Sequence, residues 1–83
     1  MKEMLTRGGA EVAEREIGLT VNGAERRIPE GWMVADLLAS LGLDARSIVI
    51  EHNGTILRDR SSFASLELSA DDTLEIVHFV GGG

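Results

Sequence analysis

Three consecutive glycines, Gly81–Gly83, close the sequence and are the residues best suited to carry chemistry. A frayed end or a cloning scar is the alternative interpretation, and it is weakened because the run follows an apolar segment without a spacer. A tail without side chains can enter a narrow channel, and glycine reaches backbone angles closed to other residues. The α-carboxylate of Gly83 becomes an acyl donor once ATP adenylates it. Because the sequence has no cysteine, we predict that Gly83 is the attachment point for a sulfur or acyl cargo.

Other side chains with catalytic potential lack suitable partners in the sequence. His78 lies beside the tail, but a lone histidine on a strand is more often a packing or surface residue, and His52 belongs to no partner pattern. Asp71 and Asp72 form an acidic pair in a predicted turn, where carboxylates are usually solvated, and calcium needs about six or more oxygens. We find no nucleophile–base pair, metal-ligand cluster or phosphate-binding loop. The sequence therefore predicts a protein that is not an enzyme and that binds no metal or cofactor itself.

Composition and charge exclude several classes of function. The chain has 83 residues, which is enough for one small domain. Its 14 acidic and 8 basic residues give a net charge of −6, which argues against binding to nucleic acid or to an anionic membrane. No apolar run approaches the roughly 18 residues that span a bilayer, and the absence of cysteine fits a reducing compartment. We expect a cytoplasmic protein.

Alternating and β-branched segments predict five strands. The strongest turn signals are the pairs Asn22-Gly23 and Asn53-Gly54, each of which favours a two-residue hairpin. Pro29 ends the second strand or places it at an edge of the sheet. The expected strands lie in the segments 16–22, 24–30, 47–52, 55–57 and 73–80. The segment 60–68 is irregular, and we expect a single helical turn there with Phe63 pointing inward.

One helix is expected between the two hairpins. Val34, Leu37, Leu38 and Leu41 have the i, i+3, i+4, i+7 spacing of an apolar helical stripe. Gly42 follows as a stop signal, and the next residue, a leucine, can fold back on the helix as in a Schellman cap.

The last strand is the most apolar. Apolar residues on both of its sides predict an interior position in the sheet. Leu74, Ile76 and Val80 share the side expected to face the core, whereas Val77 and Phe79 share the other. If that other face is open, Val77 and Phe79 form an apolar patch that leads to the tail, and exposed apolar patches often mark partner surfaces. The acidic net charge then predicts partners with basic rims.

The element order defines the fold class and the division of the chain. Two strands, one helix and three strands predict an α+β fold of the β-grasp, or ubiquitin-like, type, with a mixed four- to five-stranded sheet and the helix on one face. We expect the β-grasp domain to cover residues 16–80. Residues 1–15 are interpreted as a flexible extension, and residues 81–83 as a flexible glycine tail.

Long stretches of the sequence resemble the ThiS family, the sulfur carriers of thiamin biosynthesis. The resemblance covers nearly all of residues 17–83 and rests on WMVADLLASLGLDARSIVIEHNGTIL, on DDTLEIVHFV and on the final GGG. The sequence departs from the family pattern in two loops. Arg58-Asp59-Arg60 stands where Pro-Arg is common, and Ala70-Asp71-Asp72 where Asp-Gly-Asp is common.

The resemblance implies a sequence of reactions and three partners. A ThiF-type enzyme, using ATP and magnesium, would adenylate Gly83. A persulfide donor would convert the acyl adenylate to a thiocarboxylate, which is a 1-thioglycine at the terminus. Thiazole synthase of the ThiG type would then take the sulfur. Gly81 and Gly82 would form the arm that enters each partner.

Three alternatives stay open on the sequence alone. The small subunit of molybdopterin synthase, MoaD, shares the fold and a Gly-Gly end. A ubiquitin-like modifier would use the same carboxylate on lysines, although this chain has a single lysine, Lys2. A binding module would retain its activity when the glycines are removed.

Overall fold

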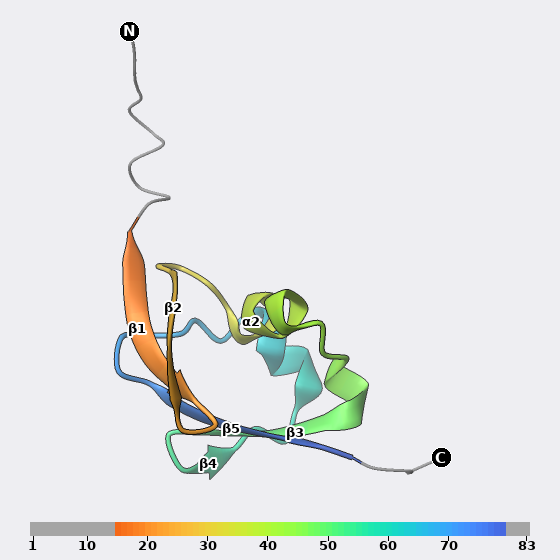
Figure 1. Ribbon diagram of the computed structural model, residues 1–83. Coiled ribbons are helices and arrows are strands. Elements are labelled where there is room, and N and C mark those ends of the chain that lie inside the picture. Colours follow the sequence, from red (N-terminus) through yellow and green to blue (C-terminus); the bar gives the residue numbers. More distant parts are fainter. Residues whose placement is uncertain (1–14, 80–83) are drawn as a thin grey trace, which may run out of the picture.

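The computed structural model describes residues 15–79, and these form one mixed sheet with a single α-helix across one face (Figure 1). The strand order is β2-β1-β5-β3-β4. In chain order the elements are β1 (Glu16–Val21), β2 (Ala24–Pro29), α2 (Val34–Leu41), the 3-10 helix η2 (Ala45–Ser47), β3 (Ile48–His52), β4 (Thr55–Ile56), the 3-10 helix η3 (Arg60–Ala64) and β5 (Thr73–His78). The predicted β-grasp architecture is confirmed, with five strands. No helix within 15–79 is long and apolar enough to cross a membrane.

Both predicted hairpins form, and their Asn-Gly turns explain them. Asn22 and Asn53 each have a φ of 51°, and Gly23 and Gly54 have φ values of 82° and 87°. Two successive residues with positive φ match the right-handed twist of the paired strands, and asparagine and glycine tolerate that conformation best. The turns set the pairing of β1 with β2 and of β3 with β4. Pro29 ends β2, which lies at an edge as expected.

The end of α2 is fixed by the predicted glycine. Gly42 adopts a left-handed conformation with φ 71°, and its N–H donates to the carbonyl of Ala39 at 3.1 Å. The N–H of Leu43 donates to the carbonyl of Leu38 at 3.0 Å. These two bonds form a Schellman motif, which satisfies carbonyls that would otherwise lack partners at the helix end. The half-buried Leu43 packs against the core.

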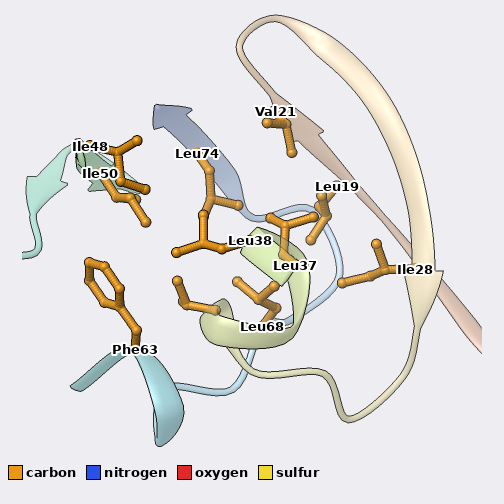
Figure 2. Packing of buried hydrophobic residues seen from close by; sticks show 11 residues of the cluster. Leu19, Val21, Ile28, Leu37, Leu38, Ile48, Ile50, Phe63, Leu68 and Leu74 are labelled. Carbon is orange, nitrogen blue, oxygen red and sulfur yellow. The ribbon is translucent and has the colours of Figure 1, made fainter. Parts of the chain in front are cut away.

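The core lies between α2 and the sheet (Figure 2). The helix buries Val34, Leu37 and Leu38, while Leu41 at the end of the predicted stripe is half-buried. Phe63 points inward from η3, as predicted, and is 3% exposed. The remaining buried apolar residues are Leu19, Val21, Ile28, Ile48, Ile50, Leu68 and Leu74. Burial of each large side chain contributes about 1.5–3 kcal/mol, so this layer holds the helix on one face of the sheet and leaves the other face free of it.

Candidate functional site

The final strand leads directly to the glycine tail and is held on both sides. β5 is the central strand: it pairs parallel with β1 and antiparallel with β3, so its predicted interior position is confirmed. Pairing with β3 extends to the last described residue, because the N–H of Phe79 donates to the carbonyl of Ser47 at 2.8 Å. The predicted tail residues Gly81–Gly83, and Val80 before them, lie outside the described residues. What the structure places is the base of the tail, at one end of the central strand.

The two predicted patch residues are exposed on the sheet face opposite the helix. Val77 is 59% exposed and Phe79 50%. Sequence reasoning missed a third large exposed residue, Ile56 of β4, which is 42% exposed. Val49 also lies on this face, because it is the cross-strand partner of Val77. The pairing register could have identified it, since directly opposed residues point to the same side of a sheet. We call these four residues the open-face patch.

Carboxylates border the open-face patch. Glu51 of β3 lies directly opposite Glu75 of β5, and on its other side it lies opposite Ile56 of β4. Two like charges at directly opposed positions destabilise a sheet. On the same face, at β1 and β2, Arg27 Nε contacts Glu16 Oε1 at 3.3 Å. The face therefore combines an apolar end, next to the base of the tail, with an acidic strip beside it.

A polar cluster holds the opposite end of β5. Asp72 is buried, with 8% of its surface exposed. Its Oδ2 lies 2.9 Å from His52 Nε2 and accepts from the backbone N–H of Ser69 at 2.8 Å, while its Oδ1 accepts from Asn53 Nδ2 at 3.0 Å. Asn53 Oδ1 in turn accepts from the N–H of Thr73 at 2.8 Å. The cluster ties the β3–β4 turn to the start of β5.

The interpretation of Asp72 as a solvated turn residue, and of His52 as a residue without a partner, is wrong. The fold brings the two side chains together across 20 positions of sequence, a proximity that no local pattern reveals. Burial acts to raise the pKa of Asp72, but hydrogen bonds from Asn53, His52 and Ser69 outweigh it and hold that pKa below its ordinary value. Within the described part of the chain, no group of three or more His, Asp or Glu side chains could hold a metal ion. The cluster is an anchor for β5, and Asp71 beside it is exposed.

The sequence model of the ThiS family matches residues 15–83. The chain belongs to the ThiS family. It is 42% identical over 50 residues to the sulfur carrier protein ThiS of Bacillus subtilis. This match covers 60% of this chain and 74% of that protein. The crystal structure of the thiamine biosynthesis protein ThiS from Geobacter metallireducens matches with a TM-score of 0.69 and 33% identity. That match covers 81% of this chain and all of the other. The predicted family resemblance and the predicted fold are thus confirmed.

Two further relatives are longer proteins that are named thiazole synthase. The chain is 42% identical over 65 residues to a thiazole synthase of Paramagnetospirillum magneticum. It is 32% identical over 63 residues to a thiazole synthase of Magnetococcus marinus. These matches cover 78% and 76% of this chain but only 20% and 19% of those proteins. The chain therefore spans about a fifth of the length of these relatives, which combine a ThiS-like segment with further sequence under the name thiazole synthase.

Proposed function

We propose that this ThiS-family chain carries sulfur as a thiocarboxylate on Gly83 and donates it for thiazole formation. The observation that supports this most is the course of β5, the central strand, which is paired with β3 as far as Phe79. Gly83 follows only four positions after Phe79 in the sequence. Four extended residues span at most about 14 Å. Without side chains on the last three, the carboxylate can reach a reaction centre inside a partner while the folded domain stays outside.

The proposed chemistry uses a partner for each step. A ThiF-type enzyme joins the Gly83 carboxylate to the AMP part of ATP, with magnesium, and pyrophosphate leaves. The terminal sulfur of a persulfide donor then attacks the acyl carbon and AMP leaves, which gives an acyl disulfide. A thiol attacks the donor-side sulfur of that disulfide, and the thiocarboxylate is released. In this scheme the chain supplies the carboxylate and the docking surface, and it is a substrate rather than an enzyme.

The open-face patch is the surface that we assign to these partners. Its residues Val77 and Phe79 lie next to the base of the tail, and the exposed fraction of each is high for a large apolar side chain. A partner that covers the patch would also cover the acidic strip of Glu51 and Glu75, and would need basic groups there. The relatives named thiazole synthase support a ThiG-type protein as one such partner. The alternatives of a molybdopterin synthase subunit and a ubiquitin-like modifier are not favoured by the family match.

Adenylation can be tested before any sulfur chemistry. The full chain is incubated with a ThiF-type enzyme, magnesium, ATP and labelled pyrophosphate, and exchange of label into ATP is measured. We expect exchange with the full chain and none with a variant lacking Gly82 and Gly83. Heat denaturation of both proteins at the same midpoint shows that the deletion leaves the fold intact. Equal exchange with both proteins, or with neither, would contradict the proposal.

A further inference from the structure

The edge of β5 that faces β1 is capped by a side chain before β5 ends. The two strands pair through Thr20 with Thr73 and Val21 with Leu74, and the N–H of Asn22 donates to the carbonyl of Leu74 at 2.8 Å. The Asn22 side chain then takes over from the backbone. Its Oδ1 accepts from the N–H of Ile76 at 2.6 Å, and its Nδ2 donates to the carbonyl of Ile76 at 3.2 Å. The side-chain amide of Asn22 thus takes the position in which a further peptide group of β1 would pair with β5.

Beyond Ile76, this edge of β5 is open. Successive residues of a strand direct their N–H and C=O groups to opposite edges. Ile76 uses the β1 edge and Phe79 uses the β3 edge, where it donates to Ser47, so the N–H and C=O of His78 point to the β1 edge. Among residues 15–79 no group pairs with them there, and His78 is exposed. Figure 1 shows β5 running on past the tip of the β1–β2 hairpin.

A groove adjoins this open edge on the helix side of the sheet. It has a volume of about 370 Å³ and lies between the hairpin tip, the end of α2 and β5. Its apolar wall includes Leu41, Leu43 and Ile76, all half-buried. Ala24 and Arg26 of β2 are exposed along its rim. The groove therefore offers an apolar surface and one guanidinium group beside Ile76, two residues before the unpaired backbone groups of His78.

We propose that this edge of β5 accepts an extended segment of a partner protein by strand addition. The segment pairs with the N–H and C=O of His78, places an apolar side chain against Leu43 and Ile76, and directs a carboxylate two residues away to Arg26. Side chains two residues apart lie on the same face of a strand, so one segment can make both contacts. The positive charge of Arg26 at this groove, on a chain of net charge −6, selects an acidic segment here, in contrast to the basic surface that the open face requires. The binding needs no adenylation, so it stands or falls separately from the proposed function.

The first test uses the free, full-length chain and amide hydrogen exchange followed by NMR. The amides of Ile76 and Phe79 have acceptors, at Asn22 Oδ1 and the Ser47 carbonyl, and should exchange slowly. The amide of His78 between them should exchange at least about tenfold faster. A slow His78 amide in the free monomer would overturn the proposal, because the edge would then be covered already. His78 protection that increases with protein concentration would also overturn it, because a second copy would then be the occupant.

The second test uses a designed probe, an end-capped and fluorescein-labelled peptide of sequence Thr-Val-Thr-Glu-Thr-Val-Thr-Glu, with fluorescence anisotropy as the readout. We expect binding, slowed exchange of the His78 amide in the complex, and no binding of the same peptide with lysine in place of glutamate. Ala24→Glu puts a carboxylate on the rim of the groove and should weaken binding about tenfold. Ala64→Glu is the matched control, an exposed alanine of η3 on a different surface, and should leave binding unchanged. Absence of binding, or equal effects of the two substitutions in variants with native spectra, would overturn the proposal.

Discussion

Glu51 and Glu75 lie directly opposite each other on β3 and β5, on the sheet face that the helix leaves free. Like charges in this arrangement reduce sheet stability, and Ile56, Val77 and Phe79 on the same face are exposed. Both features are costs to the isolated domain, and both become favourable when a partner with apolar and basic groups covers the face. The proposed docking of a partner on this face would account for both features.

Neutralising one of these carboxylates should make the domain more stable but its binding to a partner weaker. We expect Glu75→Gln to raise the free energy of unfolding by about 0.2–1 kcal/mol, because the repulsion across the strand pair is lost. The same substitution should weaken binding to a ThiG-type partner and reduce the salt dependence of that binding. Urea denaturation and titration calorimetry at two ionic strengths measure the two effects. Glu30→Gln, at an exposed residue between β2 and α2, is the control for net charge, and an identical result with it would count against the docking surface.

Removing apolar area from the patch should affect binding without affecting the fold. Val77 is 59% exposed and Phe79 is 50% exposed. Because neither side chain is buried in the core, the double substitution Val77→Ser, Phe79→Ser should move the melting temperature by only a few degrees. Binding to the ThiF-type or ThiG-type partner should weaken by about tenfold or more, as for central apolar interface residues. Thr20→Ser, on the neighbouring strand β1, is the matched control. Unaltered affinity in the double variant would show that the partner docks elsewhere.

The buried Asp72 carboxylate should make stability dependent on acid pH. Its pKa is held below the ordinary value, so the folded state binds this proton less readily than the unfolded state. The stabilisation is fully present above the ordinary aspartate pKa of about 3.9 and is lost as the pH falls through the lower pKa of the folded state. Asp72→Asn should cost about 1–3 kcal/mol at neutral pH and flatten the acid limb of a plot of unfolding free energy against pH. Asp71→Asn, at the exposed neighbour, should leave that limb in place, and the reverse outcome would contradict the role of the cluster.

Asn22 should stabilise the fold through its side-chain amide as well as through its backbone conformation in the turn. Asn22→Asp retains a residue type that tolerates the φ of 51° and keeps an acceptor for the N–H of Ile76, but it loses the donor to the Ile76 carbonyl. We expect a loss of about 1–2 kcal/mol at pH 7, measured by urea denaturation. The deficit should shrink below about pH 4, where the new carboxyl group carries a proton. A variant as stable as the parent at pH 7 would show that the amide does not extend the β1–β5 pairing.

Local sequence signals were sufficient for most of the fold. The Asn-Gly pairs fix both hairpins because few other residues accept two successive positive φ values, and Gly42 ends α2 for a related reason. Apolar residues on both sides of residues 73–80 placed the last strand in the interior of the sheet, where β5 lies. The side-chain pairing of Asn22 with Ile76 has no local signal, since it depends on how two strands 54 positions apart come together.

The candidate site was only partly predictable. Alternation along the last strand identified Val77 and Phe79, but Ile56 joins the open-face patch through the β3–β4 register. The pairing of His52 with Asp72 was missed because the residues are distant in sequence and each has an ordinary surface interpretation by itself. The predictions for Gly81–Gly83 depend on chemistry rather than on contacts, and they stay predictions.

The sulfur on Gly83 is the most direct test. The full chain is incubated with a ThiF-type enzyme, ATP, magnesium, a persulfide donor and a thiol, and the tryptic peptide 61–83 is measured by mass spectrometry. Replacing oxygen by sulfur changes the mass almost as methionine oxidation does, but this peptide contains no methionine, so the shift is unambiguous there. We predict an ATP-dependent shift that fragmentation places on Gly83 and that is absent without the persulfide donor. An unshifted peptide under conditions in which Gly83 is adenylated would contradict the account of this chain as a thiocarboxylate carrier.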